Sequence, residues 1–378
     1  MANPSWQPVP DGAVLPYFGH RNGPFRAGLL SDLNLKASVA ASLIGPAPSS
    51  GGAALLAPEW QLYVVESSPA GPAEPRLPLA FRSLLFLRPD HLLLAQPAEP
   101  VLSFYLEAPA QGRTVAQLHV ELDVAPTGRA VSPGQAPFGA VQLATGLPAA
   151  ALHLLLAHVE AVLRQRGQQR LHLRAHPFCY DPAGAAQLAE VLRRRGYPVV
   201  LAEQNVHLDL RQPYNVRLHP SERRRLAKCA RHGLHFEQEP PFLLPAAYDF
   251  IRACRQERGQ ELSLPLERLQ ELFQRFPREH FLFSVREPGG GWAAITVAIQ
   301  VSEQVLYNFY PASPLRLNAL SPVVVLNEGL HAFGRASSLR VLDLGTSTLP
   351  TGPNASLLRF KRHLGGVAGL RLSWEKTL

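Results

Sequence analysis

The sequence predicts an α+β protein with two tandem domains, each a mixed, mainly antiparallel sheet flanked by helices. Three observations support this fold class. The chain has 378 residues, which is long enough for two domains of ordinary size. In two regions apolar residues alternate along short segments, as they do in half-buried strands. Each of these regions then continues as helix, strand, helix and strand, with apolar residues recurring at helical spacing.

The start of the chain shows no pattern typical of a packed core. It is rich in proline and glycine, as in the run Gly45–Gly52, and up to about residue 60 it has no sustained period of 2 or 3.6 residues. We therefore expect a low-complexity, poorly ordered leader over residues 1–85. A first domain is expected over 86–212 and a second domain over 213–378.

The first domain has the pattern of a small sheet followed by helices. Val101–Leu106 and Ala116–Val124 are expected to be neighbouring antiparallel strands, and Pro137–Gln142 a third strand. Apolar residues recur at helical spacing over 152–163 and stop before Gly167, which predicts a helix with a glycine cap. The remaining expected elements are a strand at 171–174, a helix at 185–195 and an alternating strand at 199–210.

The second domain repeats this rhythm. Pro220 stands at a first-turn position and Gly233 at a terminating position, so we expect a helix over 221–232. The segment 287–291, Glu-Pro-Gly-Gly-Gly, is expected to be a turn between strands. The other expected elements are helices near 250–254 and at 266–273, strands at 281–286, 292–300 and 305–310, a helix at 323–333, a strand at 340–344, a helix at 357–364 and a last strand at 367–372.

Charge and cysteine content argue against several classes of protein. The formal net charge is +8, but only four of the cations are lysines, and only Arg223–Arg231 forms a cluster. Net charge by itself therefore does not indicate a nucleic-acid surface. The three cysteines are never spaced as C-x-x-C, which argues against a zinc ribbon or a disulfide framework. No run of about 18 apolar residues and no signal-like start is present, so we expect a cytoplasmic protein without a membrane span.

Several common enzyme motifs are absent from the sequence. It contains no P-loop, no G-x-G-x-x-G after a strand, no H-E-x-x-H and no G-x-S-x-G. Nucleotide hydrolysis by a P-loop, dinucleotide binding, zinc proteolysis and hydrolase-elbow chemistry therefore lose their main support. His172 and His176 lie across an expected strand and turn with no third ligand nearby, so no metal site is predicted.

A group of polar residues near the C-terminus is the main candidate site. Asp343 ends an expected strand, and the loop after it is a place where side chains and backbone donors converge. The next helix carries Lys361. Asp343 is a candidate catalytic residue, and the candidate substrate-binding residues are Lys361, Gly345, Ser347, Asn354 and Arg359. The sequence leaves open the alternative that Asp343 only satisfies backbone groups in the loop and that Lys361 is a solvated helix charge.

Three segments of this region resemble the C-terminal half of the Fem-like, tandem GNAT acyltransferases: Ser321–Gly334, Val341–Gly345 and Leu358–Gly365. That family typically shows a helix, a D-x-G strand end and an F-K-x-x-x-G helix ahead of the last strand. Pro220–Gly233 is similar to the basic helix that opens the family's second domain, and Ser132–Gly139 and His176–Tyr180 are similar to segments of its first domain. The resemblance spans about residues 95–378.

The resemblance implies two GNAT-like domains and transfer of an acyl or aminoacyl group to a small-molecule or peptide amine. The donor would lie where two central strands diverge. Asp343 would act as base or orient the acceptor, and Lys361 would neutralise a phosphate or carboxylate. Tyr307 or Tyr310 would donate a proton to the leaving group, unless these tyrosines are ordinary half-buried strand residues. The CoA-binding signature Q/R-x-x-G-x-G/A is incomplete at each candidate position, so acyl-CoA and aminoacyl-tRNA both stay open as donors. No bound cofactor is expected.

A second hypothesis is a GNAT-like binding protein without catalysis. It would recognise an anionic ligand or a nucleic acid, such as tRNA, through the arginine-rich helix, with Arg224, Lys228 and Arg231 as anion-binding residues. Binding of that kind weakens steeply as salt is added. The sequence equally allows these cations to be a solvated helix face.

Overall fold

The computed structural model describes residues 59–67, 71–94, 101–122, 128–134, 136–349 and 352–378. All of them belong to one compact unit of the chain. Residues 1–58 of the predicted leader lie outside the described residues. Strand β1 (Gln61–Glu66) falls within the remainder of that predicted leader, and it pairs antiparallel with β2 (Val101–Ala108).

Thirteen of the described strands form one sheet with a mixed but mainly antiparallel pattern. Its order is β1-β2-β3-β4-β6-β15-β7-β12-β11-β10-β9-β8, and β5 pairs with β3 beside this path. Two pairs of named strands in the described part are parallel, β4 with β6 and β11 with β12. The remaining strand bounds are β3 (Arg113–Leu122), β4 (Arg129–Ser132), β5 (Gln142–Leu143), β6 (Arg170–Arg174), β7 (Val199–Asp209), β8 (His235–Glu239), β9 (His280–Arg286), β10 (Trp292–Ser302), β11 (Val305–Asn308), β12 (Val341–Thr346), β15 (Val367–Thr377) and the separate pair β13 (Thr348–Leu349) and β14 (Gly352–Pro353).

Helices cover the sheet on both faces. Along β10, Ile295, Val297 and Ile299 pack into the core under α5 and α6, while Ala294 and Ala298 pack into the core under α4, α7 and α8. The predicted α+β fold class is therefore confirmed. The helices are α1 (Pro89–Leu94), α2 (Ala149–Gln165), α3 (Pro182–Arg194), α4 (Pro220–Arg231), α5 (Leu244–Gln256), α6 (Leu266–Arg275), α7 (Val323–Ala336) and α8 (Ala355–His363), with short 3₁₀ turns η1 (Leu85–Leu87), η2 (Pro109–Gln111), η3 (Tyr214–Val216), η4 (Pro241–Leu243) and η5 (Leu315–Leu317).

Local sequence signals explain where the helices near the candidate site begin and end. Helix α4 starts at Pro220, whose missing N–H costs nothing in a first turn, and is followed by Gly233 with φ +72°. Helix α8 is capped by Asn354, whose side chain accepts a hydrogen bond from the Leu357 N–H. No helix in the described part of the chain is long and apolar enough to cross a membrane.

The prediction of a strand at Pro137–Gln142 is wrong. Strand β4 takes the place beside β3, and β5 contributes only two residues. The segment between them buries Phe138, which is 1% exposed and meets the rings of Phe86, His176 and Tyr180 edge-on. An aromatic anchor buried from a loop gives the same apolar signal as a strand residue, so the periodicity did not separate the two cases.

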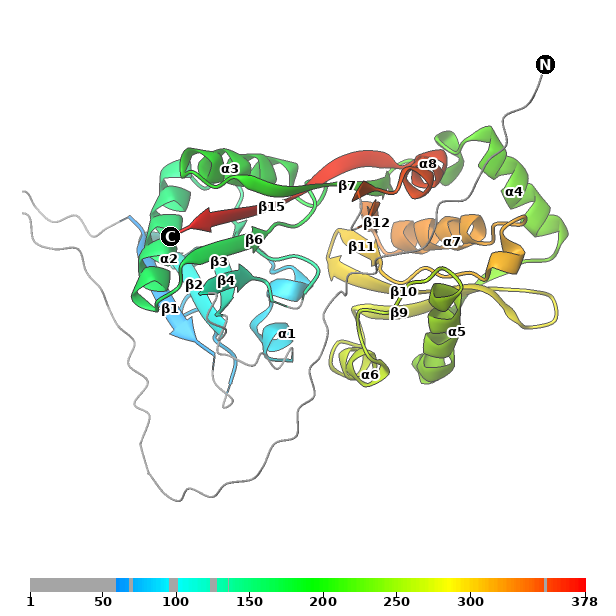
Figure 1. The fold of residues 1–378 in the computed structure, drawn as a ribbon, viewed down its shortest axis with the longest axis horizontal. Helices are drawn as coiled ribbons and strands as arrows, with labels where there is room; N and C mark the ends of the chain where they lie inside the picture. The colour runs from blue at the N-terminus through cyan, green and yellow to red at the C-terminus, as the bar shows by residue number, and fades with distance from the viewer. Residues whose placement is uncertain (1–58, 68–70, 95–100, 123–127, 135, 350–351) are drawn as a thin grey trace, which may run out of the picture. The chain divides into compact units, whose positions relative to one another are not determined.

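The long strand β7 connects the parts of the sheet that the sequence assigned to two domains. Its first residues pair with β15, and its last residues pair with β12 on one side and β15 on the other. Strand β15, at the end of the chain, also pairs with β6, so it lies between two strands of the predicted first domain; Figure 1 shows β15 running beside β7. The domain boundary between residues 212 and 213 therefore stays a prediction. The sheet itself is continuous across it.

Candidate functional site

The parallel strands β11 and β12 separate in the middle of the sheet. They pair from Val305 with Val341 to Tyr307 with Asp343, and no further. Beyond this point β11 ends at Asn308, while β12 continues to Thr346 with an irregular register against β7. Gly345 makes that irregularity possible, since its φ of +73° strongly disfavours a side chain. We call the point beyond the Tyr307–Asp343 pair the strand divergence.

Asp343 is buried at the strand divergence, with 2% exposure, and accepts hydrogen bonds on both carboxylate oxygens. The Tyr180 hydroxyl donates to Oδ2 at 2.7 Å. The Asn205 Nδ2 and the Gly345 N–H donate to Oδ1 at 2.8 and 2.7 Å. Burial, and then the adjacent carboxylate, raise the pKa of Tyr180 well above its usual range, so this hydroxyl keeps its proton and donates. The donors allow a carboxylate to be buried here.

Lys361 lies at the same divergence and is 8% exposed. Its Nζ donates hydrogen bonds to the carbonyl oxygens of Gly345 at 3.0 Å and Thr346 at 2.8 Å. Among the described residues it forms no ion pair. Burial lowers the pKa of Lys361 to about 8, the negative charge of Asp343 opposes this shift, and the positive charge of Arg255 adds to it. Lys361 is therefore mainly protonated at neutral pH, and it releases its proton at slightly alkaline pH.

The two candidate tyrosines are placed differently. Tyr307 is half-buried at the divergence, and a Cβ added to Gly345 would lie 3.4 Å from its ring. Burial raises the pKa of Tyr307, so it stays a proton donor. The Tyr310 hydroxyl instead forms a hydrogen bond with the Ser263 hydroxyl at 2.5 Å and accepts one from the Leu264 N–H at 3.1 Å. Tyr307 thus faces the Asp343 loop, whereas Tyr310 holds the segment between α5 and α6.

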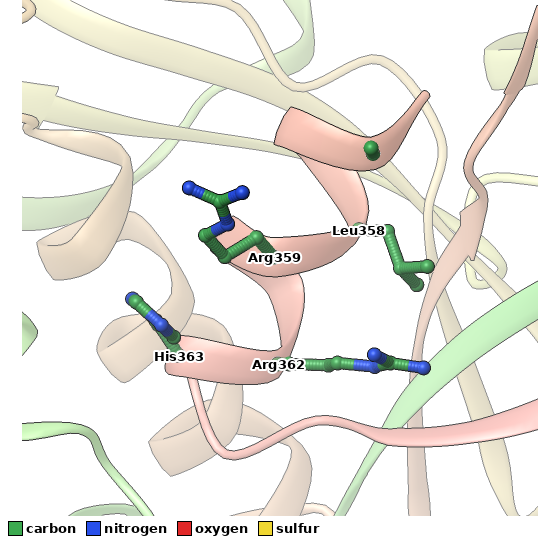
Figure 2. Close-up of a pocket in the computed structure, with 5 residues that line it drawn as sticks. Leu358, Arg359, Arg362 and His363 are labelled. Atoms are coloured by element: carbon green, nitrogen blue, oxygen red, sulfur yellow. The ribbon is translucent and has the colours of Figure 1, made fainter. Parts of the chain in front are cut away.

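The remaining predicted substrate-binding residues, Ser347, Asn354 and Arg359, lie on α8 or in the segment that precedes it. Ser347 is 2% exposed, and its hydroxyl has no hydrogen-bond partner among the described residues. Its carbonyl accepts the N–H of Asn354, the residue that caps α8. Arg359 is exposed on α8; Figure 2 shows it projecting on the same side as His363, with Arg362 on the other side. These three residues, with Ala355 and Leu358, line an open hollow of about 500 Å³.

The predicted anion-binding residues lie on one face of α4. Arg224 and Arg231 are exposed and Lys228 is half-buried. Their spacing of four and three residues places them on one side of the helix. Within the described residues none of the three forms an ion pair, and no hydrogen bond joins them to Asp343 or Lys361. Nor does the described part of the chain hold a group of three or more His, Cys, Asp or Glu side chains placed to bind a metal ion.

Comparison with known proteins identifies the fold. No family model matches the sequence, and no curated protein gives a significant match. The solved structure of FemX matches with a TM-score of 0.58 and 10% sequence identity, over 73% of this chain and 87% of FemX. The chain has the FemX fold. A conserved protein of unknown function from Bacteroides thetaiotaomicron matches with a TM-score of 0.50 and 10% identity, over 79% of this chain and 92% of that one. A tandem GNAT protein from the clavulanic acid biosynthesis pathway matches with a TM-score of 0.43 and 16% identity, over 75% and 85%.

The FemX fold confirms the resemblance at the level of architecture. The structure of this chain also shows two contacts that the sequence did not reveal. Tyr180 and Asn205 are 163 and 138 residues from Asp343 in the chain, and both donate to its carboxylate. Asn205 offers one signal in retrospect, because it begins the alternating polar and apolar residues Asn205–Asp209 of β7. Tyr180 lies in a loop after β6, and its one signal is the resemblance of His176–Tyr180 to a segment of the Fem-like first domain.

Proposed function

We propose that the chain is an N-acyltransferase. It would transfer an acyl or aminoacyl group from a thioester (acyl-CoA) or an aminoacyl-tRNA to a small-molecule or peptide amine. The observation that carries this proposal is the ammonium group of Lys361, which rests on the carbonyls of Gly345 and Thr346 where β11 and β12 diverge in a FemX-type fold. Strand divergence of this kind is where the resemblance to Fem-like proteins puts the acyl donor.

The reaction makes three demands on the site. The amine nitrogen forms a bond to the donor carbonyl carbon, the C–S or C–O bond of the donor breaks, and the amine's proton ends on the thiol or hydroxyl that leaves. Catalysis therefore needs the two substrates in position, a cation or donor for the oxygen that becomes negative, and groups that carry the proton.

In the proposed mechanism Lys361 supports the developing negative charge. It is positive at neutral pH, it is buried, and with a pKa of about 8 it can also exchange a proton close to neutrality. Tyr307 keeps its proton and is the candidate donor to the leaving group. The oxygens of Asp343 already accept hydrogen bonds from Tyr180, Asn205 and Gly345. Because Gly345 belongs to the loop whose carbonyls bind Lys361, Asp343 orients that loop in this arrangement.

The test is a transfer assay with acyl-CoA and aminoacyl-tRNA donors and a panel of amine acceptors. Where transfer is found, Lys361→Ala is expected to reduce kcat/KM about 100-fold or more, as loss of one oxyanion-stabilising group does. Lys376→Ala is the matched control, because Lys376, near the end of β15, pairs with Glu160 of α2. Equal activity of Lys361→Ala and the control would overturn the role of Lys361. Absence of transfer from every donor would overturn the proposed function.

One observation supports the second candidate, a GNAT-like protein that binds an anionic ligand or nucleic acid. Arg224, Lys228 and Arg231 form a row of cations on α4 that no described carboxylate pairs with, and such rows bind phosphate backbones. The test is tRNA binding at low salt by the double variant Arg224→Ala/Arg231→Ala, compared with the charge-matched control Arg193→Ala/Arg194→Ala on α3. No binding by the wild type, or equal binding by the two double variants, would rule this candidate out.

A further inference from the structure

A second cation at the strand divergence is unpaired. Arg255 lies near the end of α5 and is half-buried. Its Nη1 donates to Oε1 of Gln260 at 2.8 Å and its Nη2 to the carbonyl oxygen of Pro311 at 3.3 Å, and both acceptors are neutral. Its neighbours on the same segment have carboxylates: Arg252 pairs with Asp249 at 2.7 Å and Arg258 approaches Glu257 at 3.7 Å. Arg255 has no carboxylate within ion-pair distance among the described residues.

Arg255 on α5 and Lys361 on α8 each donate to backbone carbonyl groups that lie beyond the last β11–β12 pair. Pro311, whose carbonyl Arg255 holds, follows shortly after the last residue of β11. Gly345 and Thr346, whose carbonyls Lys361 holds, form the end of β12. Lys361 is thus bonded to the carbonyls that end β12, and Arg255 to a carbonyl three residues beyond the end of β11. The positive charge of Arg255 also contributes, after burial, to the lowered pKa of Lys361.

The negative charge nearby does not balance this pair. Asp343 supplies one negative charge for two cations, and three donors already occupy its oxygens. Glu203, whose charge also acts on Tyr307, is paired with Arg371. Burying a charge without a partner costs free energy, so proteins usually pair such groups or use them to bind a ligand. A guanidinium has five N–H donors in a planar fork that matches the oxygens of a carboxylate or phosphate. Arg255 commits only two of its nitrogens to described partners.

We propose that Arg255 binds an anionic group of the substrate, a carboxylate or a phosphate, at the strand divergence. This inference rests on the proposed function, since it assigns a chemical class to the substrate of the same site. The anion supplies the counter-charge that Arg255 lacks, and it fixes the substrate beside the two loops that Arg255 and Lys361 hold. A neutral substrate leaves a net positive charge at the strand divergence.

The first test measures binding and needs no turnover. The thermal unfolding midpoint of the full chain is measured with inorganic phosphate, pyrophosphate or succinate, each against chloride at equal ionic strength. We expect at least one of these anions to raise the midpoint of the wild type and of the control Arg252→Gln, because a ligand that binds the folded state stabilises it. Arg255→Gln is expected to lose this shift. The anion that acts tells a phosphate site from a carboxylate site.

The same variants separate a binding role from a structural one. Glutamine is shorter than arginine and has an uncharged amide, so Arg255→Gln removes the charge together with the hydrogen bond to Gln260. Removal of a half-buried charge that has no ion-pair partner is expected to offset that lost hydrogen bond, so Arg255→Gln should unfold, without added anion, close to the wild-type midpoint. A lower midpoint would mean that Arg255 stabilises the fold. Such a lower midpoint would overturn the inference. The inference would also be overturned if Arg255→Gln responded to the anion as the wild type does, or if the wild type responded to none of the anions.

A kinetic measurement links the inference to transfer and keeps the two failures distinguishable. With an active donor and acceptor, Arg255→Gln is expected to raise KM at least tenfold for an anionic substrate and to change it little for the neutral amide or ester analogue, with kcat nearly constant. Equal KM changes for both would overturn the inference while transfer itself remained. An anion response without any transfer would leave Arg255 as an anion site and remove the proposed reaction.

Discussion

The buried ammonium of Lys361 gives the structure a pH dependence that can be measured without knowing the substrate. Lys361 has a pKa of about 8, lowered from 10.5 mainly by burial. Below pH 8 the lysine is protonated in the folded and the unfolded state, and the folded state carries the full cost of the buried charge. As pH rises from 8 to 10.5, the folded protein releases this proton before the unfolded chain does. The contribution of Lys361 to stability therefore rises with pH over this window.

The size of the effect follows from the shift. A pKa lowered from 10.5 to about 8 corresponds to roughly 3 kcal/mol of destabilisation at pH 7. Because the folded state begins to lose the proton first, about 1.3 kcal/mol of this cost disappears between pH 7 and pH 9. Methionine or arginine at position 361 does not titrate in this range. The free energy of unfolding of the wild type, relative to that of either variant, should therefore be about 1.3 kcal/mol higher at pH 9 than at pH 7.

The assay is urea unfolding of the wild type, Lys361→Met and Lys361→Arg at pH 7 and pH 9. Each variant also changes hydrogen bonds to Gly345 and Thr346, but that change adds the same amount at both pH values. The two variants serve as controls for each other, since the difference between them should not depend on pH. A constant difference between the wild type and both variants from pH 7 to pH 9 would refute the shifted titration of Lys361.

Three further substitutions test the network around Asp343. Asp343→Asn removes the charge that raises the pKa of Lys361, so that pKa should fall below about 8 in a nitrogen-15 NMR titration; an unchanged or higher value would contradict the electrostatic coupling. Tyr180→Phe takes a donor from a buried carboxylate and should cost about 1–3 kcal/mol in urea unfolding, and no loss would show that this hydrogen bond is dispensable. Gly345→Ala forces a side chain into φ +73° beside the Tyr307 ring and should cost about 1–2 kcal/mol, as measured by thermal unfolding, whereas wild-type stability would speak against strain at this turn.

Local patterns in the sequence were enough to predict most of the secondary structure. The helix expected at 221–232 is α4 at Pro220–Arg231, because a first-turn proline and a terminating glycine act within a few residues of each other. The strands expected at 281–286 and 292–300 match β9 and β10, since a glycine-rich turn joins neighbours in the sheet. Where the signal is local, composition and spacing determine the element.

The candidate site shows where such patterns stop. Asp343, Gly345 and Lys361 come from the short stretch that the sequence singled out, and the structure joins them through hydrogen bonds. Tyr180 and Asn205 complete the shell of Asp343 from far away in the chain, and their approach depends on how β7 pairs. A periodicity records which face of a strand is buried, but not which strand lies beside it.

Strand β15 shows why the site belongs to the whole chain. It pairs with β6 and with β7, and it buries Leu372 and Trp374 in the core that α2 and α3 cover. Its Gly369 lies opposite Asn205, so Asn205 has β15 on one side and, through Thr346, β12 on the other. The amide that donates to Asp343 is therefore held between the last strand of the chain and the strand that carries the candidate site. The segment 213–366 by itself contains Asp343 and Lys361 but lacks both side chains that donate to the Asp343 carboxylate.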